Sequence, residues 1–341
     1  MKALFIGGTG TISSSVTDLA VKQGWELYLL NRGSKPVPEG CHSIIADITD
    51  EAAVAAKLQN MQFDVVADFI AFSASDVERD IRLFADKTKQ FIFVSSASAY
   101  QKPPRHYKTT ESTPLVNPYW SYSRAKIEAE EVLQKAYREN GLPITIVRPS
   151  HTYGDKKIPV AFYGANGSWQ VVERIKQGKP VLIHGDGTSL WTLTHNTDFA
   201  KGFVGLMGNQ AAIGETVHIT SDEVLTWNSI YDIIGDALGK RVNKVHVSTD
   251  FLVMCRPDLE GSLYGDKAEC AVFDTSKIKR LVPSFAATKR FDQGVREAIE
   301  NFERHPDWQQ PDPEFDKFCD TVIEAQKSAA EQIRKTLGLN C

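Results

Sequence analysis

Two side chains spaced four residues apart form the pattern in this sequence that is best suited to chemistry. Tyr122 and Lys126 lie in a stretch, 119–140, that is predicted to be helical, and residues four apart on a helix share a face, with roughly 5 to 6 Å between Cβ atoms. A phenol with an ordinary pKa of about 10 carries protons poorly at neutral pH, and a neighbouring ammonium favours the phenolate. A third element is the predicted strand end Phe91–Ser96, where a hydroxyl of Ser95 or Ser96 could bind the substrate oxygen that Tyr122 protonates. This triplet predicts acid–base chemistry at a substrate oxygen.

A glycine-rich turn directly follows the first predicted strand, Lys2–Ile6. Gly8, Gly10 and Ser13 occupy the three positions of the GxGxxG pattern, with serine in place of the third glycine. In a Rossmann turn, such glycines permit the tight bend from strand to helix and the close approach of a pyrophosphate to the helix N-terminus. The alternative, a turn without a ligand, is disfavoured by its place on the first strand of a βαβ series. The loop residues expected to contact a dinucleotide are Gly7, Gly8, Thr9, Gly10, Thr11 and Ile12.

The ends of the second and third predicted strands bear on which dinucleotide binds. Asn31 occupies the position where an acidic residue would bind the ribose 2′-hydroxyl of NAD. Arg32 follows with a guanidinium suited to bidentate phosphate recognition, unless it only faces solvent in a polar turn. These residues favour NADP(H) and leave NAD(H) open. Asp47 and Ile48 are placed to meet the adenine; alternatively, Asp47 caps the next helix.

These residues must be positioned by elements that alternate through the first part of the chain. Strands separated by helical patterns form βαβ units, whose right-handed crossovers generate a parallel sheet covered on both faces. The sequence therefore predicts an α/β fold, a Rossmann-type doubly wound parallel sheet. The predicted strands are Lys2–Ile6, Glu26–Leu30, Ser43–Ala46, Asp64–Asp68, Gln90–Val94 and Pro143–Val147, and the predicted helices are 11–23, 50–59, 74–86 and 119–140.

The alternation weakens after Arg148, which predicts a change of domain. We expect an NAD(P)-binding domain over 1–150 and a smaller substrate-side region over 151–305, interleaved with a returning strand near Val217–Thr220. A C-terminal helical extension is expected over 306–341. Apolar residues at helical spacing predict that its helix, Glu314–Leu337, packs on the body; they are Phe315, Phe318, Val322 and Ile323.

Composition excludes several classes of protein. The chain has 341 residues, with 39 Lys+Arg against 43 Asp+Glu and a net charge of −4, and it is 42% hydrophobic and 24% charged. These values are typical of a globular protein rather than a disordered or collagenous one, and they give no global electrostatic reason to bind nucleic acid. Since nothing approaches the roughly 18 consecutive apolar residues of a membrane span, no membrane partner is expected. The first apolar run is broken by glycines after six residues, which is too short for a signal peptide.

Cysteine usage indicates a reducing compartment. The five cysteines are odd in number and widely spaced, and they lack CxxC pairing or a histidine at metal-ligand spacing. We therefore expect reduced thiols in a cytoplasmic protein, and no metal site. The residues are Cys41, Cys255, Cys270, Cys319 and Cys341.

Four motifs, in this order along the chain, resemble the extended short-chain dehydrogenase/reductases, the NAD-dependent epimerase/dehydratase family. They are the Gly7–Ser13 turn, Ser95–Tyr100, Tyr122–Lys126 and Arg148-Pro149, and the resemblance covers residues 1 to about 300.

The resemblance implies a catalytic triad of Ser96, Tyr122 and Lys126, in which Tyr119 is not the catalytic tyrosine. Tyr122 would act as general acid and base, Lys126 would lower its pKa and hold the nicotinamide ribose, and Ser96 would polarise the substrate oxygen. The family pattern also implies a homodimer through helices that include the Tyr122 helix. Besides Tyr122 and Lys126, it implies cofactor contacts from Phe69, Ile70, Ala71, Pro149 and His151.

Departures from the family pattern narrow the reaction. Ala97 and Ser98 stand where sugar-nucleotide dehydratases carry an acidic pair, so dehydratase chemistry is disfavoured. Trp191 replaces an arginine that grips the substrate pyrophosphate, and His151 stands where nucleotide-sugar epimerases have asparagine. Ser98, His151 and Trp191 are therefore candidate substrate residues, unless Trp191 is a core residue and His151 a structural one. We expect an epimerase or oxidoreductase acting on a hydroxyl or carbonyl carbon of a sugar, sugar nucleotide or sugar-like small molecule.

An alternative from another class is an RNA-binding or scaffold protein that retains the Rossmann fold. The Asn31–Gly33 turn and the Phe63–Asp68 segment also resemble the atypical branch that includes chloroplast stem-loop-binding proteins. A binding module, however, has no need to keep Ser96, Tyr122 and Lys126 together, and the chain has no RGG tract or strongly basic stripe. We therefore expect a small-molecule partner and no nucleic acid.

Overall fold

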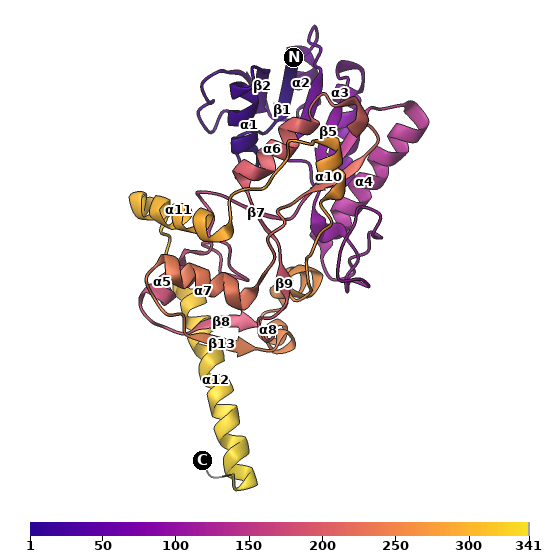
Figure 1. Cartoon of the computed structure of the whole chain (residues 1–341). Helices are drawn as coiled ribbons and strands as arrows, with labels where there is room; N and C mark the ends of the chain where they lie inside the picture. Colours follow the sequence, from indigo (N-terminus) through magenta and orange to yellow (C-terminus); the bar gives the residue numbers. More distant parts are fainter. Residues whose placement is uncertain (340–341) are drawn as a thin grey trace. The chain divides into compact units, whose positions relative to one another are not determined.

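The computed structural model describes residues 1–339, which form two compact units (Figure 1). Unit 1 comprises Met1–Gly154, Leu190–Val224 and Glu260–Phe291. Unit 2 comprises Asp155–Ser189, Leu225–Leu259 and the residues from Asp292 onward. The chain therefore passes between the two units several times.

Unit 1 is built on a seven-stranded sheet in the order β11-β6-β5-β4-β1-β2-β3. Every neighbouring pair runs parallel, which confirms the predicted doubly wound sheet. The strand order reverses at β1, which lies between β2 and β4, and in open α/β sheets ligands bind outside the carboxyl ends of strands at such a switch point. The strands are β1 (Lys2–Ile6), β2 (Glu26–Asn31), β3 (Cys41–Ile45), β4 (Val65–Asp68), β5 (Phe91–Val94), β6 (Ile144–Pro149) and β11 (Thr216–Ile219).

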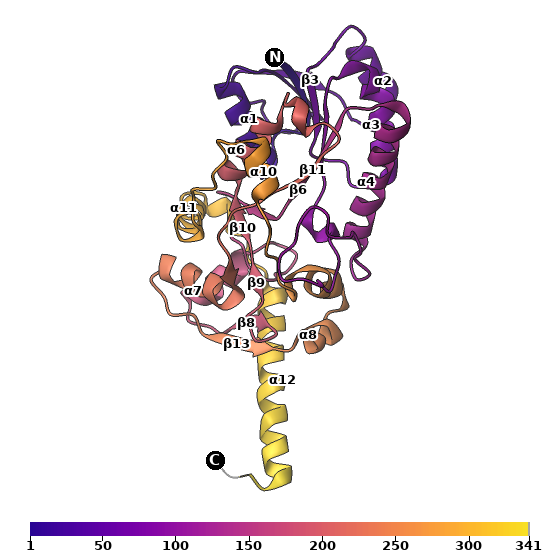
Figure 2. The ribbon, with the colours of Figure 1, turned by 45° about the vertical axis from the view of Figure 1, so that its right-hand side comes forward.

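Helices cover both faces of this sheet, as Figure 2 shows. The central strand β1 reads Lys-Ala-Leu-Phe-Ile, and successive side chains of a strand point to opposite faces. Ala3 and Phe5 enter one core with α1, α6 and α10, whereas Leu4 and Ile6 enter the other with α2, α3 and α4. The helices are α1 (Ser13–Lys22), α2 (Glu51–Lys57), α3 (Ala74–Phe84), α4 (Ser121–Asn140), α6 (Asn196–Leu206) and α10 (Ser276–Leu281).

Short elements complete unit 1. Strand β7 (His151–Tyr153) pairs in parallel with β10 (Leu193–His195). The others are η1 (Ala85–Lys87), η2 (Ala97–Ala99), β9 (Leu190–Trp191), η3 (Gln210–Ala212), α9 (Glu260–Ser262) and the π-helical turn η5 (Leu263–Lys267).

Unit 2 pairs β8 (Val181–His184) in parallel with β13 (Lys244–Val247). Its other elements are α5 (Trp169–Lys176), β12 (Leu225–Thr226), α7 (Trp227–Ala237), α8 (Thr249–Cys255), η4 (Pro257–Leu259), α11 (Phe291–Arg304), η6 (Pro306–Trp308) and α12 (Pro313–Leu337).

The predicted C-terminal helix is present as α12, but only its first turns pack. Phe315, Cys319, Val322 and Ile323 are buried, whereas the residues from 324 to 339 are exposed. Figure 1 shows this part of α12 in yellow, extending beyond β8 and β13. The expected packing therefore ends at Ile323.

Helix α4 begins two residues later than the sequence pattern predicts. Asn117 Oδ1 accepts hydrogen bonds from the backbone N–H groups of Tyr119 and Trp120, both at 3.2 Å, which holds these residues in a turn. The first helical residue is therefore Ser121, and Tyr122 lies in the first turn.

The cysteines described by the structure carry free thiols; they are Cys41, Cys255, Cys270 and Cys319. Cys341 lies outside the described residues. Within residues 1–339, no helix combines the length and the apolar character needed to cross a bilayer.

Candidate active site

The glycine turn after β1 forms a backbone cradle at the start of α1. Gly7 and Gly8 have φ of 102° and 96°, a left-handed region that L side chains rarely adopt. A Cβ on Gly8 would lie 2.7 Å from the Leu29 side chain. Ile12 precedes α1 without a side-chain cap, so N–H groups of the first helical turn remain available to an anion. The turn therefore fits a dinucleotide pyrophosphate.

Contacts from distant residues hold this loop in place. Asn196 Nδ2 donates to the Thr11 carbonyl at 3.0 Å, and Thr17 Oγ1 donates to the Gly8 carbonyl at 2.9 Å. Asn196 starts α6, far along the chain, and no local pattern near the loop points to it. Sequence reasoning therefore missed this residue.

Asn31 ends β2 and Arg32 follows it, near Asp47 in the loop after β3. Asn31 Oδ1 accepts from the Gly33 N–H at 2.9 Å, whereas its buried Nδ2 has no hydrogen-bond partner within residues 1–339. Arg32 is exposed. Hydrogen bonds from Thr49 lower the pKa of Asp47, and the positive charge of Arg32 acts in the same direction. Arg32 and Asp47 therefore belong to one polar edge of unit 1.

The alternative that Asp47 caps the next helix is wrong. Asp50 is the N-cap of α2 and accepts from the Ala53 N–H at 3.0 Å. Asp47 instead accepts from the backbone N–H and the hydroxyl of Thr49, at 3.0 and 2.7 Å. Ile48 is buried in the core beneath.

Residues after β4 also reach the glycine turn. A Cβ on Gly7 would lie 3.0 Å from Ile70 Cγ2, so Ile70 packs on this turn. Ile70 is otherwise exposed and Ala71 is buried. Phe69 points into the core, with its ring 5.2 Å from that of Phe5.

The structure brings Ser96 and Tyr122 together. Ser96 caps η2, and its hydroxyl lies 2.9 Å from the Ser98 hydroxyl, which accepts from Ser123 Oγ at 2.8 Å. Tyr122 is half-buried beside Trp120, with 5.0 Å between ring centroids. Burial raises the Tyr122 pKa, and a hydrogen bond with Ser96 opposes that rise. The phenol and the Ser96 hydroxyl can thus serve one substrate oxygen.

Lys126 lies one turn further along α4 and is buried. Its Nζ donates to the carbonyls of Ala71 and Val94 at 2.6 and 2.8 Å. It also lies 4.7 Å from the ring centroids of both Phe72 and Phe93. Burial lowers the pKa of Lys126 to about 8. The ammonium is therefore held by the carbonyl of the last residue of β5 and by a carbonyl in the turn that follows β4.

A buried ion pair fixes α4 to the neighbouring strands. Arg148 on β6 donates to both oxygens of Glu130 on α4, through Nε at 2.9 Å and Nη2 at 2.5 Å. Ser95 Oγ donates to the same carboxylate at 2.5 Å, and the Arg148 guanidinium lies 4.7 Å from the Tyr100 ring centroid. This cluster links the residue before Ser96 to the helix that carries Tyr122.

The candidate substrate residues are largely enclosed. Trp191 is buried and its Nε1 donates to His151 Nδ1 at 3.2 Å. His151 is half-buried and follows the buried Pro149 closely in the chain. Ser98 is buried within the serine cluster. His151 and Trp191 are thus brought together, and each is held by the other.

Sequence reasoning missed two polar residues at this site. Asn117 is buried, and its Nδ2 donates to the carbonyls of Ser98 and Gly265 at 2.8 and 2.7 Å. Its signal is the Asn-Pro pair before α4, which favours a turn. Asp68 ends the buried strand Val-Val-Ala-Asp. An acidic residue at the end of an apolar strand is the sequence feature that could have identified it.

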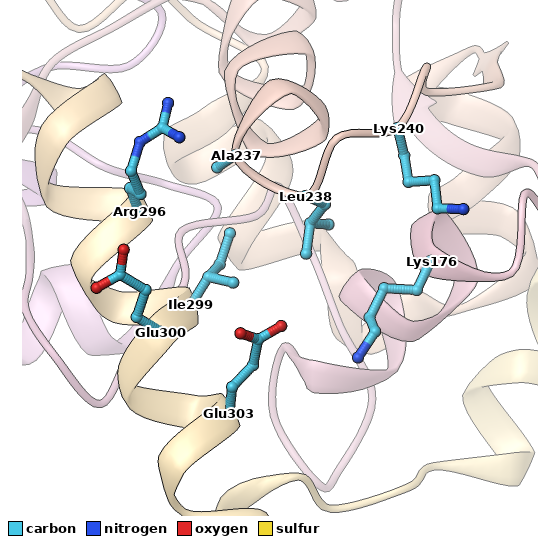
Figure 3. Close-up of a pocket in the computed structure, with 8 residues that line it drawn as sticks. All are labelled: Lys176, Ala237, Leu238, Lys240, Arg296, Ile299, Glu300 and Glu303. Carbon is cyan, nitrogen blue, oxygen red and sulfur yellow. The ribbon is translucent and has the colours of Figure 1, made fainter.

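Unit 2 carries a hollow of about 500 Å³ between α5, α11 and the end of α7 (Figure 3). None of the predicted site residues lines it. Its walls mix both charges around a few apolar groups: Lys176, Ala237, Leu238, Lys240, Arg296, Ile299, Glu300 and Glu303.

Comparison with known proteins agrees with the geometry of unit 1. Residues 3–220 match the model of the NAD dependent epimerase/dehydratase family. The chain belongs to this family. The match spans the glycine turn, the Ser96 strand end and the Tyr122 helix, so the predicted resemblance is confirmed.

Curated relatives of this family member include a reductase and a stem-loop binding protein. The chain is 25% identical over 287 residues to 2′-dehydrokanamycin reductase from Streptomyces kanamyceticus, covering 84% of this chain and 80% of the relative. It is 28% identical over 244 residues to chloroplast stem-loop binding protein of 41 kDa b from Arabidopsis thaliana, covering 67% of this chain and 61% of the relative.

Solved structures of epimerases share the fold. Epimerase Mth375 from Methanothermobacter thermautotrophicus matches with a TM-score of 0.74 and 17% identity, covering 90% of this chain and 94% of the other. UDP-glucuronic acid 4-epimerase from Bacillus cereus, in complex with UDP-glucuronic acid and NAD, matches with a TM-score of 0.71 and 20% identity, covering 89% and 99%. At these identities the likeness concerns the fold.

Proposed function

We propose that this family member is an NAD(P)-dependent epimerase or reductase acting on a hydroxyl or carbonyl carbon of a carbohydrate-like small molecule. The observation that carries the proposal is the arrangement at the strand ends of unit 1. There the Ser96 hydroxyl contacts the Tyr122 phenol, and the Lys126 ammonium is seated at the ends of β4 and β5. The glycine turn that fits a pyrophosphate follows β1 of the same sheet.

The three side chains divide the acid–base work. When bound, the nicotinamide supplies or accepts a hydride at the substrate carbon. Tyr122 donates a proton to the substrate oxygen, or accepts it in the reverse direction, while Ser96 holds that oxygen by a hydrogen bond. The Lys126 ammonium is largely charged at neutral pH because its pKa is about 8. The group that opposes the burial-raised pKa of Tyr122 is Ser96, through its hydrogen bond, rather than Lys126. Both an epimerase and a reductase can use these roles.

We propose NADP(H) as the preferred cofactor. Arg32 follows β2, and its exposed guanidinium is close enough to Asp47 to lower the pKa of that carboxyl group. A 2′-phosphate on the adenosine ribose of the cofactor would meet the Arg32 guanidinium at this strand end. The buried Asn31 Nδ2, without a partner in the described residues, is a further donor at this edge. No carboxylate occupies the position that would favour NAD.

Dehydratase chemistry is disfavoured by the residues that follow Ser96. Ala97 has no titratable group, and Ser98 is buried with its hydroxyl bonded to two other serines. Elimination of water requires an acid and a base at the substrate carbon, and these positions offer neither.

Replacing the Tyr122 hydroxyl tests the proposed reaction. We expect Tyr122→Phe to reduce NADPH-dependent turnover by about 10²- to 10⁴-fold, the usual contribution of a positioned acid–base group, while NADP⁺ affinity stays unchanged. The assay follows NADPH oxidation with keto sugars, including 2′-dehydrokanamycin, the compound that the reductase relative is named for.

Tyr119→Phe is the matched control, because Tyr119 lies just before α4 and packs against Tyr264 instead, with 5.7 Å between the ring centroids. It should leave turnover unchanged. Full activity of Tyr122→Phe would move the chemistry to another residue.

A second candidate function is RNA binding, favoured by the likeness to the chloroplast stem-loop binding protein. It predicts that the protein binds an RNA stem-loop and that the logarithm of the binding constant falls linearly with the logarithm of the salt concentration. Absence of such binding, together with saturable NADP⁺ binding and turnover, would exclude it.

A further inference from the structure

Two carboxyl groups meet in the interior of unit 1, behind Lys126. Asp68 ends β4 and Asp80 lies on α3, and both side chains are fully buried. The carboxyl groups are within hydrogen-bonding distance of each other. Neither belongs to the triad or to the glycine turn.

One oxygen of each carboxyl group is fully satisfied. Asp68 Oδ1 accepts from the backbone N–H groups of Ile70 and Ala71 at 2.6 and 2.8 Å. Asp80 Oδ1 accepts from Arg79 through Nε at 3.0 Å and Nη2 at 2.9 Å. The other oxygen, Oδ2, is buried in both residues and has no donor among residues 1–339.

A single proton between the two groups would remove this deficit. An ionised carboxylate only accepts hydrogen bonds, so two facing carboxylates leave two buried acceptors unpaired and repel each other. A proton turns one Oδ2 into a donor for the other. Asp80 is the better holder, since burial and the neighbouring Asp68 raise the pKa of Asp80, while Asp68 receives two amide N–H groups.

We propose that Asp68 and Asp80 share one proton, and that neutral Asp80 is a positioning residue for Lys126. Its hydrogen bond to Asp68 fixes the carboxylate that binds the Ile70 and Ala71 amides. The Ala71 carbonyl then accepts from Lys126 Nζ at 2.6 Å. The chain of contacts from Asp80 to Lys126 thus runs through Asp68 and one backbone turn.

The charged groups around Asp68 and Asp80 keep the same protonation state between pH 5 and 7, so the shared proton can be tested in that range. Between pH 5 and 7 the arginines and Lys126 stay protonated, and the nearby acids whose pKa values are lowered stay ionised. The groups that act on the pair or on its arginine are Arg79, Asp76 and Arg82 on α3, Lys126 on α4, and Asp47 and Glu51 beyond β3.

Proton uptake on folding provides the test. The folded pair keeps a proton that the unfolded aspartates, with pKa values of about 3.9, release above pH 5. Asp80→Asn supplies the missing donor without a proton, so the ratio of its folding constant to that of the wild type should rise about tenfold per pH unit between pH 5 and 7. Urea unfolding at each pH measures this ratio.

Asp68→Asn tests whether the proton is shared. Its amide would donate to Asp80, which can then ionise beside Arg79, so the same tenfold rise per pH unit is expected. Asp76→Asn, on the same helix, is the control, with a flat ratio. A flat ratio for Asp80→Asn would mean that both acids are ionised, and a flat ratio for Asp68→Asn alone would place the proton on Asp80 without sharing. Either result overturns the proposal.

Dinucleotide affinity tests the positioning role, which rests on the proposed function of Lys126. We expect Asp80→Ala to weaken NADP⁺ binding about tenfold by displacing the ammonium, and Asp80→Asn to restore it to within about twofold. Val77→Ala is the matched control, because Val77 is a buried apolar residue of α3. It should lower the melting temperature without changing NADP⁺ affinity.

Equal weakening by Asp80→Ala and Val77→Ala would show that Asp80 is only structural. The unfolding experiment needs neither cofactor nor substrate. If the wild type binds no dinucleotide, the proposed function fails while the shared proton is still decided by the pH dependence.

Discussion

Two buried carboxylates flank Lys126, and they are satisfied in different ways. Glu130 lies on the same helix as Lys126, and it receives three hydrogen bonds from Arg148 and Ser95. Asp68, at the end of β4, receives two backbone N–H groups on one oxygen, and its other oxygen has no donor among residues 1–339 and faces the carboxyl group of Asp80. Both carboxylates raise the pKa of Lys126 against the larger effect of burial.

The difference shows two ways of keeping a negative charge beside a buried ammonium. A guanidinium neutralises Glu130 permanently, since arginine does not lose its proton in proteins. A shared proton leaves a single charge on the Asp68 pair, and that arrangement depends on pH. The ion pair between Glu130 and Arg148 should therefore contribute to the stability of the fold. The Asp68–Asp80 pair should make both the stability of the fold and the position of Lys126 depend on protonation.

The largest effect is expected from removing the ion pair between Arg148 and Glu130. Arg148→Leu leaves a buried carboxylate without its cation, which typically costs about 3 to 5 kcal/mol of unfolding free energy. Urea unfolding measures the loss. Arg82→Leu, which removes an ion pair with Glu51 at 2.6 Å between exposed side chains, is the control and should have a far smaller effect. A comparable loss in the two variants would contradict the role given to burial.

A smaller effect concerns Lys126, which lies between the two carboxylates. Its folded pKa of about 8 lies below the ordinary value of 10.5, so between these values the unfolded chain binds a proton that the folded chain has released. Stability of the wild type should then rise with pH above 8, opposite in sign to the shared-proton effect.

Lys126→Met should abolish this rise in stability above pH 8, because methionine has no ionisable group. Between pH 8 and 9 the wild type should become more stable relative to the variant by about 1 kcal/mol, somewhat less than the limit of 1.4 kcal/mol per pH unit for one proton. Unfolding by urea at both pH values measures the change. A constant difference would mean that Lys126 keeps an ordinary pKa in the fold.

Local patterns predicted the elements that carry the site. The apolar runs of β1 and β4 to β6 and the glycine turn are encoded by neighbouring residues, so strand ends were located within one or two residues. Fold class followed from the alternation of strands and helices, because parallel strands need crossovers. The later start of α4 depends on Asn117, whose side chain holds the preceding turn.

Long-range contacts are what the sequence did not reveal. Asn196 supports Thr11, and Asp80 meets Asp68, only because the fold brings separate elements together. On α3, Asp80 is one acid among several in the run Ser-Asp-Val-Glu-Arg-Asp, and nothing in the pattern marks it as the buried one. The position of Lys126 against two carbonyls depends equally on the ends of β4 and β5.

Dinucleotide binding to the wild type and to Arg32→Ala tests the central claim most directly. Calorimetric titration with NADP⁺ and NAD⁺ should show saturable binding of both to the wild type, with NADP⁺ the tighter. Loss of one charged contact typically costs about 1.5 to 3 kcal/mol, or roughly 10- to 150-fold in affinity, and Arg32→Ala should lose this for NADP⁺ alone. Equal losses for the two dinucleotides would contradict the assignment of Arg32, and no binding of either to the wild type would contradict the proposed enzyme.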